Sequence, residues 1–302
     1  MENGIKNTST VPEITIVTGT LNRPQIVLQL ITQLVEYSKN RSIEVVVVDQ
    51  SVSENYQLLQ KQFPDLAEFH LVHFDVPNTC KYLNYGWTHA RAPIVLYLDD
   101  DVTITDKTIS AHLDAYNNKQ ILGVAGRVIN DGETVSQDGN VGRVLWYGAE
   151  FKKNFTYEKS TYVDFPYGCN MSFRKETLVA IDGFDEKLSP PIYAYNEVDL
   201  GYRISKKRKK SLLFSPDALV YHHQYKRGGT RNDFELNQVA QSNNFNYGYF
   251  LGKNFSLFEN LICFIRRFPY QIIKEPNALS AIISGFISSR ATRGVSNRRK
   301  EG

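Results

Sequence analysis

Three consecutive aspartates, Asp99, Asp100 and Asp101, follow an apolar run over residues 93–98. Carboxylates packed together at the end of a buried strand repel one another, and the loss of water strengthens the repulsion. A divalent cation with oxygen ligands removes this repulsion, and Mg²⁺ and Mn²⁺ favour carboxylates. The triplet therefore predicts a metal site, and a solvated turn whose acids cap the following helix is the alternative.

A second polar cluster follows the first apolar strand of the chain, before a helical pattern. It contains Thr18, Thr20, Asn22 and Arg23. Polar groups and a guanidinium at a helix start suit a phosphate or nucleotide contact. An ordinary loop with Asn22 as the helix cap is equally compatible with the pattern. Neither a dinucleotide fingerprint nor a P-loop pattern follows this strand.

The elements that must position these groups alternate along the first third of the chain. Apolar segments predict strands at 13–18, 42–49, 70–74 and 93–98, and amphipathic spacing predicts helices at 25–37, 54–62 and 82–91. This alternation indicates a mostly parallel sheet covered by helices on both faces. Because ligands of such sheets bind at the carboxyl edge, we expect Thr18–Arg23, Asp49 and Asp99–Asp101 to face one cleft.

Later segments bring further groups toward that cleft. A helical pattern over 196–204 begins with Glu197, which can point into the cleft. Strands at 211–214 and 218–221 lead to His222 and His223, which face opposite sides by strand alternation. A hydrogen-bonded surface position is the alternative for either histidine. The loop that follows contains Arg227 and Arg231 among glycines, and it is suited to closing over a diphosphate.

Composition and charge narrow the class of protein. The chain has 302 residues and a net charge of +3, so charge by itself indicates neither a nucleic-acid nor a membrane partner. Its three cysteines are far apart and form no zinc pattern or disulfide framework, which suits a reducing compartment. The first residues lack the apolar core of a signal peptide, and no apolar stretch approaches the roughly 20 residues of a membrane span. The sequence predicts a cytoplasmic protein without a nucleic-acid partner.

The carboxyl-terminal region is basic and amphipathic. Residues 251–302 hold nine Lys and Arg against three Glu. Apolar residues recur at helical spacing over 256–268, and a second apolar stretch covers 278–287. One interpretation is a set of helices packed on the catalytic domain. The other is an interfacial anchor that associates with the anionic inner face of the membrane.

Four segments together resemble the inverting, GT-A-fold glycosyltransferases of family 2, over Glu13–Arg231. Residues 14–24 are similar to the family's opening strand with its T-x-N-R turn, and residues 46–49 to the second strand with its terminal Asp. Residues 98–101 resemble the DXD motif, and residues 196–203 the E-D-x-D-L-x-x-R segment. The family's E-D pair reads Asn196-Glu197 here, so the carboxylate at the position of the catalytic base has one extra methylene.

The resemblance implies a fold and a domain organisation. It implies a three-layer α/β/α sandwich with a mostly parallel central sheet, plus a helical carboxyl-terminal region. The glycosyltransferase domain would cover residues 12–235, with a nucleotide-binding half at 12–105 and an acceptor half at 120–235. Residues 236–302 would form the helical, basic region.

The resemblance also implies roles for individual residues. The catalytic base would be Glu197, and Mn²⁺ or Mg²⁺ would be held by Asp99, Asp101 and His222. The nucleotide sugar would contact Thr18, Thr20, Asn22, Arg23, Asp49, Asp99, Asp100, Arg227 and Arg231. The acceptor would be bordered by Gly168, Asn170, Phe184 and Asp185.

The implied activity is metal-dependent, inverting transfer of a sugar from a nucleoside diphosphate sugar to a hydroxyl of a glycan or lipid-linked acceptor. Such an enzyme would act in the synthesis of cell-surface polysaccharide or glycolipid. Two alternatives remain: a nucleotide-sugar-binding protein with impaired catalysis, because of Asn196-Glu197, and a metal-dependent nucleotidyltransferase. The second would usually carry a glycine-rich nucleotide loop after the first strand, which residues 19–22 match poorly.

Overall fold

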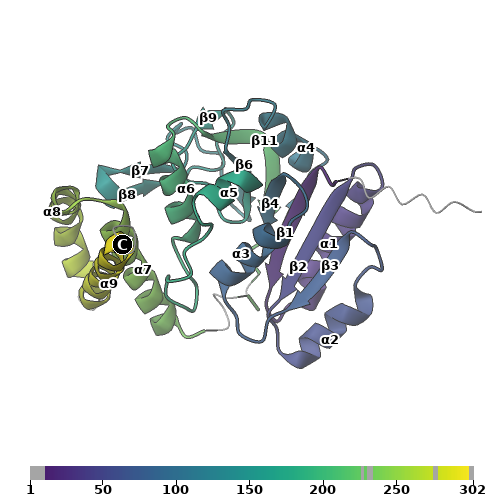
Figure 1. The fold of residues 1–302 in the computed structure, drawn as a ribbon, viewed down its shortest axis with the longest axis horizontal. Helices are drawn as coiled ribbons and strands as arrows, with labels where there is room; N and C mark the ends of the chain where they lie inside the picture. The colour runs from purple at the N-terminus through teal and green to yellow at the C-terminus, as the bar shows by residue number, and fades with distance from the viewer. Residues whose placement is uncertain (1–10, 226–227, 230–233, 275–277, 299–302) are drawn as a thin grey trace, which may run out of the picture.

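The computed structural model describes residues 11–225, 228–229, 234–274 and 278–298. Within them, the largest sheet has nine strands in the order β3-β2-β1-β4-β10-β6-β11-β5, with β9 paired to β11 (Figure 1). Its strands are β1 (Ile14–Thr20), β2 (Ile43–Asp49), β3 (Phe69–His73), β4 (Ile94–Leu98), β5 (Val102–Ile104), β6 (Gly123–Asn130), β9 (Thr161–Tyr162), β10 (Asn170–Arg174) and β11 (Leu212–His222). The two strands β7 (Arg143–Leu145) and β8 (Glu150–Lys152) form a separate hairpin.

Helices cover both faces of this sheet. The described helices are α1 (Pro24–Ser38), α2 (Ser53–Gln62), α3 (Thr79–His89), α4 (Thr108–Ala115), α5 (Lys175–Ala180), α6 (Asn196–Lys207), α7 (Leu236–Asn254), α8 (Leu257–Lys274) and α9 (Ala278–Arg298), with a short 3₁₀ turn, η1 (Trp146–Gly148). Of these, α7, α8 and α9 lie beyond the sheet, at one end of the molecule (Figure 1). The pairs β1–β2, β2–β3, β1–β4 and β6–β11 are parallel. The predicted three-layer sandwich with a mostly parallel sheet is confirmed, and so are the carboxyl-terminal helices.

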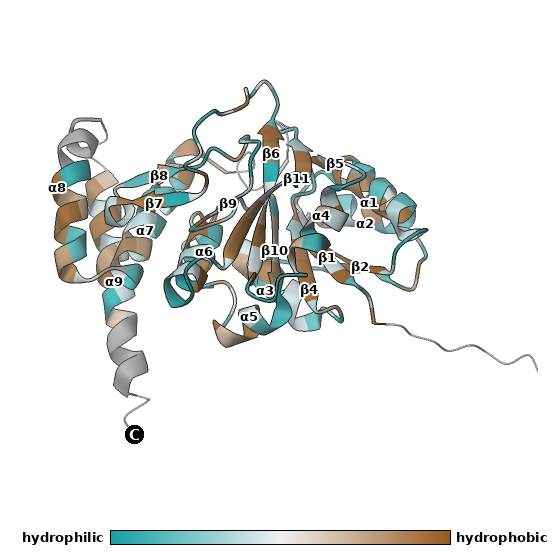
Figure 2. Ribbon diagram, turned by 90° about the horizontal axis from the view of Figure 1, so that it is seen from above, coloured by the Kyte–Doolittle hydropathy of each residue, from teal (hydrophilic) through white to brown (hydrophobic). Residues whose placement is uncertain are grey.

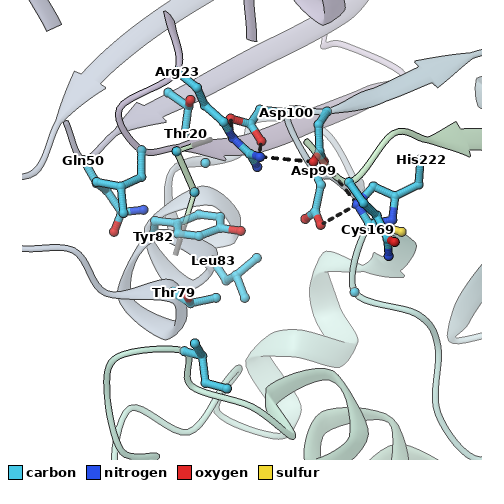
Figure 3. Close-up of a pocket in the computed structure, with 18 of the residues that line it drawn as sticks. Thr20, Arg23, Gln50, Thr79, Tyr82, Leu83, Asp99, Asp100, Cys169 and His222 are labelled. Atoms are coloured by element: carbon cyan, nitrogen blue, oxygen red, sulfur yellow. Dashed lines mark hydrogen bonds and ion pairs between the residues drawn. The ribbon is translucent and has the colours of Figure 1, made fainter. Parts of the chain in front are cut away.

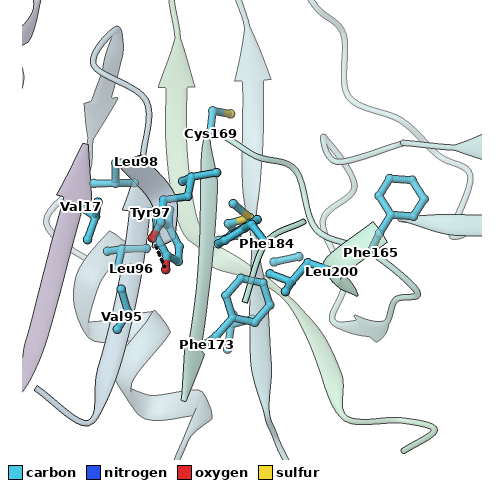
Figure 4. Close-up of a cluster of buried hydrophobic side chains, with 14 of the residues drawn as sticks. Val17, Val95, Leu96, Tyr97, Leu98, Phe165, Cys169, Phe173, Phe184 and Leu200 are labelled. Carbon is cyan, nitrogen blue, oxygen red and sulfur yellow. Dashed lines mark hydrogen bonds between the residues drawn. The ribbon is translucent and has the colours of Figure 1, made fainter. Parts of the chain in front are cut away.

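The central strands are buried along their whole length because helices lie on both faces. Every residue of β2 and of β4 is buried, which agrees with their continuous apolar sequences. On the face that carries α3, Tyr97 of β4 packs edge-on against Phe184 with ring centroids 5.4 Å apart, and its hydroxyl donates to the backbone oxygen of Leu83 (Figure 4). This apolar layer fixes β4, and thereby the aspartates that follow it.

The sheet register brings the ends of separate strands to one edge. Thr20 at the end of β1 pairs with Asp49 at the end of β2. Leu98 at the end of β4 pairs with Asn170, where the antiparallel strand β10 begins. His222 at the end of β11 pairs with Val102 just beyond the aspartates. The expectation that these strand ends share one edge is therefore confirmed by the topology.

Two details of the structure refine the predicted elements. The strands expected at 211–214 and 218–221 form one strand, β11, whose register shifts between Ser215 and Leu219. Residues 236–254 form helix α7, which lies inside the region 236–302 that is expected to be helical, although no amphipathic spacing marks this segment by itself. This helix buries polar side chains such as Asn246 and Asn254 as well as apolar ones, so it lacks the polar and apolar faces that reveal a surface helix.

The carboxyl-terminal helices lie together at the end of the molecule opposite β3 and α2 (Figure 1). Helices α7 and α9 pack at backbone distance, because a Cβ added at Gly248 would overlap the backbone of Ile282 and one at Gly285 would overlap that of Phe245. Lys253 of α7 donates to Asp199 of α6 at 2.8 Å and to Asp185 at 2.6 Å. The helical region is thus fastened to α6 and to the segment that contains Asp185. No helix in the described ranges is long and apolar enough to cross a bilayer.

Candidate active site

A cavity of about 370 Å³ opens at the carboxyl edge of the sheet (Figure 3). Its walls come from the turn after β1, the aspartates after β4, the end of β11 and the first turn of α6. The predicted site residues that line it are Thr20, Arg23, Asp99, Asp100, Asp101, Gly168, Glu197 and His222. Segments far apart in the sequence therefore meet where α/β sheets bind their ligands.

The three aspartates occupy different environments. The side chain of Asp99 is 40% exposed, whereas that of Asp100 is 1% exposed and that of Asp101 is 4% exposed. The backbone N–H of Asp99 donates to the backbone oxygen of Cys169 at 3.3 Å, and the backbone oxygen of Asp101 accepts from the backbone N–H of His223 at 3.0 Å. These bonds hold the triplet between two neighbouring segments of the sheet edge, so its carboxylates have fixed positions.

Arg23 forms an ion pair with the two buried aspartates. Its Nε donates to Oδ2 of Asp100 at 2.8 Å, a second guanidinium N–H donates to the other oxygen, and a third contacts Oδ2 of Asp101 at 3.1 Å. Burial lowers the pKa of Arg23, but the adjacent aspartates outweigh it and raise that pKa above its usual value. Burial also raises the pKa of Asp100 to about 6 against the effect of Arg23. Arg23 therefore neutralises part of the acidic cluster from within.

Gly228 and Gly229 lie on the turn that carries Arg23. The N–H of Gly229 donates to the oxygen of Leu21 at 2.9 Å. Both glycines have positive φ, and a Cβ at Gly229 would lie 2.9 Å from Cζ of Arg23. Only glycine permits this backbone so close to the guanidinium. The two expected diphosphate ligands of this loop, Arg227 and Arg231, lie outside the described residues.

His222 faces the aspartates, and His223 turns away. Nε2 of His222 lies 3.2 Å from Oδ1 of Asp101 and 3.9 Å from Oδ2 of Asp99. Nδ1 of His222 lies 2.9 Å from Oδ1 of Asn130, whose amide nitrogen donates to Glu133. This orientation of Asn130 places a proton on Nδ1, so Nε2 is the nitrogen that faces the carboxylates: it donates to Asp101 when the imidazole is protonated, and its lone pair is available to a metal ion when the imidazole is neutral. His223 contacts Oγ1 of Thr103 at 2.8 Å instead.

The donor atoms in this corner fit a hard divalent cation. Oδ1 of Asp101 is buried and has no hydrogen-bond partner among the described residues, although it faces His222. Burial raises the pKa of Asp101, but His222 and Arg23 outweigh it, so that carboxyl stays ionised. Cys169 also lies within ligand distance of Asp99 and His222, but burial raises the pKa of its thiol well above the usual value. Carboxylate and imidazole are thus the available donors, which suits Mn²⁺ or Mg²⁺.

Glu197 lines the cavity from the first turn of α6. The helix is preceded by Tyr195 with a left-handed φ of 70°, and Asn196 beside Glu197 also lines the cavity. Gly168 lies against Glu197, because a Cβ at Gly168 would be 3.9 Å from Cδ of that glutamate. The cavity therefore brings together the carboxylates that follow β4 and one further carboxylate from α6.

Asp199, two residues further along α6, anchors the helix. It accepts from Nε of Arg203 at 2.8 Å, from Nζ of Lys253 at 2.8 Å and from the amide of Asn254 at 2.9 Å. Burial raises the pKa of Asp199, but the two cations outweigh it and hold that pKa below its usual value. This network fixes the start of α6 and therefore the position of Glu197.

Three residues expected to contact the nucleotide do not line the cavity. Thr18 is buried in β1. Asp49 is fully buried and accepts from the N–H and the hydroxyl of Ser51, both at 2.9 Å. Asn22 accepts from the N–H of Val52 at 3.1 Å through its side chain. Asn22 joins the turn after β1 to the turn after β2, and Asp49 holds Ser51 within the second of these turns, so both shape the edge of the site.

Three of the four residues expected to border the acceptor also lie away from the cavity. The side chain of Asn170 is buried, and it donates to the backbone oxygens of Arg127 and Ala218. Phe184 belongs to the apolar layer around Tyr97 (Figure 4). Asp185 is held by Lys253. Gly168 is the member of this set that lines the cavity.

The cavity also contains residues that the sequence analysis did not identify. Tyr82 on α3 lies across Gly19 of β1, where a Cβ would be 2.6 Å from its ring. Burial, with Asp99 and Asp100 adding to it, raises the pKa of Tyr82 well above its usual value, so its phenol keeps the proton. Gln50 and Ile192 line other parts of the wall. An isolated tyrosine or glutamine carries no spacing signal, so only the fold identifies these residues.

Comparison with protein families gives one match that covers more than half of the chain. Residues 15–181 match the family described as glycosyl transferase family 2. The matched region contains β1 and the turn with Arg23, the three aspartates and Gly168. Glu197 and His222 lie beyond it.

Individual relatives are similar at lower identity. A glucosyl-dolichyl phosphate glucuronosyltransferase of Haloferax volcanii is 24% identical over 193 residues, which cover 60% of this chain and 59% of that protein. The mannosyltransferase PcManGT of Pyrobaculum calidifontis, solved with GDP-Man and Mn²⁺, superposes with a TM-score of 0.55 at 18% identity, over 94% of this chain and 76% of that chain. GalNAc-T7, solved with UDP, GalNAc and Mn²⁺, superposes with a TM-score of 0.58 at 13% identity, over 90% of this chain and 58% of that chain. The two structural similarities support the GT-A fold.

Proposed function

The chain belongs to glycosyl transferase family 2, and from that premise we propose that it transfers a sugar from a nucleoside diphosphate sugar to an acceptor hydroxyl with inversion at the anomeric carbon. The observation that carries the proposal is the composition of the cavity at the sheet edge. Of its described lining residues, four are carboxylic acids, and Arg23, already engaged by Asp100 and Asp101, is the one permanent cation. Such a cavity repels a bare diphosphate unless a divalent cation accompanies it.

We assign the donor to residues 12–105 and the metal to Asp99, Asp101 and His222. A bound Mn²⁺ or Mg²⁺ would neutralise the charge that develops on the leaving diphosphate. Arg23 keeps Asp100 and Asp101 in place while that charge develops. The hydroxyl of Tyr82 can donate a hydrogen bond to the nucleotide sugar. The names of the two solved relatives, which include GDP-Man, UDP and Mn²⁺, support a nucleoside diphosphate and a hexose-type donor.

We assign the acceptor to residues 120–235 and the role of general base to Glu197. A new bond forms between the acceptor oxygen and the anomeric carbon while the bond from that carbon to the diphosphate oxygen breaks. Glu197 takes the proton of the attacking hydroxyl. Attack from the side opposite the diphosphate inverts the anomeric centre. Gly168 supports this assignment because its lack of a side chain leaves room beside the Glu197 carboxylate.

The proposal predicts metal-dependent binding of a nucleoside diphosphate, and calorimetric titration tests it. Release of a nucleoside diphosphate during turnover is the expected product, whereas release of pyrophosphate would favour the nucleotidyltransferase alternative. The family match supports the glycosyltransferase. We include glycan and lipid-linked acceptors, because the named relative of Haloferax volcanii carries a dolichyl phosphate sugar in its name.

We further propose that the protein docks on an anionic membrane surface through the outer face of α8 (Figure 2). One side of α8 packs inward through Asn260 and Cys263. The other side exposes Leu257, Phe258, Leu261 and Ile265, each more than half exposed; we call these four residues the α8 apolar face.

Aromatic and cationic side chains adjoin the α8 apolar face. Trp146 of η1 is 49% exposed, and the guanidinium of Arg266 lies 3.4 Å from the centre of its ring. An exposed tryptophan beside arginine and aliphatic side chains suits the boundary between lipid headgroups and acyl chains. The excess of cations over residues 251–302 complements an anionic leaflet. These features support a cytoplasmic protein at the inner face of the membrane.

We expect wild-type protein to float with phosphatidylglycerol-containing vesicles, and the variant Leu261→Glu/Ile265→Glu to remain unbound. Two added carboxylates on an exposed face leave the fold intact but oppose insertion between anionic headgroups. Val179→Glu on α5, which changes another highly exposed apolar residue, is the matched control and should float like the wild type. Equal flotation of all three proteins, or none by the wild type, would reject membrane docking by this face.

A further inference from the structure

A second cavity lies directly beside the first. It has a volume of about 530 Å³ and lies between the segment 189–191, helix α7 and the first turn of α9. Pro191 lines this second cavity, and the next residue, Ile192, lines the cavity that contains Glu197. Consecutive Cα atoms are about 3.8 Å apart, so one short segment separates the two cavities.

We propose that this second cavity, the α7 groove, binds the second sugar residue of the acceptor, so that the enzyme extends an existing neutral glycan. This inference rests on the proposed function for the chemistry at Glu197. It adds the class of acceptor and the place where the part of the acceptor that does not react is held.

The side chains of the α7 groove are those of a carbohydrate site. Phe234 and Phe245 contribute aromatic rings to its lining, Pro190 and Pro191 contribute apolar pyrrolidine rings, and Gln238 and Gln241 contribute exposed amides. Sugar rings offer apolar C–H faces that pack on such rings and hydroxyls that exchange hydrogen bonds with amides.

The described residues that line the α7 groove argue against charged and lipid ligands. No lining residue in the described part of the chain is Asp, Glu, Lys, Arg or His. A phosphate or carboxylate group would be expected to meet a cation there. An acyl chain would bury the amides of Gln238 and Gln241 without hydrogen-bond partners. A neutral polyhydroxyl ligand can pack its C–H groups on the rings and exchange hydrogen bonds with the amides.

The segment between the two cavities is held rigidly on α7. The N–H of Ser189 donates to Oδ1 of Asn246 at 2.6 Å, and its backbone oxygen accepts from Oγ of Ser242 at 2.8 Å and from the amide of Asn246 at 3.0 Å. Ser242 and Asn246 are themselves buried. Because α7 is also tied to α6 through Lys253 and Asp199, the α7 groove keeps a fixed position relative to Glu197. A preorganised subsite of this kind would set which hydroxyl reaches the base.

The test is oligosaccharide binding by the full chain, measured on an array of neutral oligosaccharides of two to six sugars and the matching monosaccharides. Gln241→Trp fills the α7 groove from an exposed position, and Asn243→Trp places the same bulk at an exposed position of α7 outside the groove. We expect at least one oligosaccharide to bind wild type and Asn243→Trp, and to bind Gln241→Trp at least tenfold more weakly. Binding of the matching monosaccharide should change less than threefold.

The double variant Gln238→Ala/Gln241→Ala removes the two amides without adding bulk. It should also bind the oligosaccharide at least tenfold more weakly than the wild type. The inference is overturned if no oligosaccharide binds wild type, or if all variants bind alike. Parallel titration of each protein with UDP, GDP and dTDP in Mn²⁺ separates this inference from the proposed function. Nucleotide binding without Gln241-sensitive glycan binding rejects the α7 groove alone. Glycan binding without any nucleotide binding rejects the donor site and leaves the α7 groove supported.

Discussion

Replacement of Glu197 by glutamine is expected to lower the rate of sugar transfer by about 10²–10⁴-fold, the usual contribution of a general base. Glutamine keeps the size and the hydrogen-bonding shape of the side chain but cannot accept the acceptor's proton. Glu197 is not one of the proposed metal ligands, Asp99, Asp101 and His222, so metal-dependent nucleotide binding should remain unchanged. The measurement is the initial rate of transfer, with calorimetric nucleotide binding on the same samples.

Two variants sharpen this prediction. Glu176→Gln changes an exposed acid in the first turn of another helix, α5, and should keep full activity. Glu197→Asp restores the carboxylate type typical at the base position of the family and should retain more activity than the glutamine variant. Full activity of Glu197→Gln would contradict the assignment of the base. Nucleotide binding without transfer by any of these proteins, wild type included, would favour the binding protein with impaired catalysis.

Replacement of Arg23 by methionine is expected to lower the free energy of unfolding by about 3–5 kcal/mol, as for other buried ion pairs that lose one partner. The reason is that Asp100, with a side chain 1% exposed, would lose its bidentate partner inside the fold. Uptake of a proton by Asp100, whose pKa is already about 6, limits the loss. Urea denaturation at pH 7.5 without added metal measures the effect.

Matched controls separate the buried pair from a general effect of losing an arginine. Arg41→Met breaks an exposed pair with Glu13 and should change the free energy of unfolding by less than about 1 kcal/mol. The double variant Arg23→Met/Asp100→Asn removes both charges and should recover part of the loss. If Arg23→Met is as stable as Arg41→Met, then Arg23 does not hold the aspartates.

The sequence was most informative where burial leaves a continuous apolar pattern. Strands β1, β2 and β4 are covered on both faces, and their β-branched runs and the alternating helices correctly predict parallel strands whose ends share one edge. Helix α7 lies in the region expected to be helical, but its bounds cannot be predicted, because its buried surface includes asparagines, serines and glycines that pack against other helices and form no apolar stripe. Its partners come from the 185–189 segment and α9, and tertiary contacts of this kind leave no periodic signal.

The candidate site shows the same limit at the level of single residues. The aspartates, Glu197 and His222 stand at predicted strand or helix ends, so their meeting follows from topology. The partner of Arg23 does not follow from topology, because a guanidinium at a helix start suits an external phosphate as well as an internal carboxylate. The resemblance implies that Asn170 borders the acceptor, yet its side-chain amide donates hydrogen bonds to backbone oxygens inside the sheet. Which way a polar side chain turns depends on neighbours that are distant in sequence.

The proposal that the cavity binds a nucleotide sugar through a metal ion is best tested by calorimetric titration with UDP, GDP and dTDP, each with Mn²⁺ and each with EDTA. We expect the wild type to bind at least one of these nucleotides in the presence of Mn²⁺ and to lose this binding in EDTA. The Asp101→Asn variant should bind the same nucleotide at least tenfold more weakly. Asp106→Asn, a change of another acid a few residues along, should bind like the wild type. Failure of wild type to bind any of the three nucleotides in Mn²⁺, or equal binding by Asp101→Asn, would contradict the assignment of this cavity to a metal-bound nucleotide sugar.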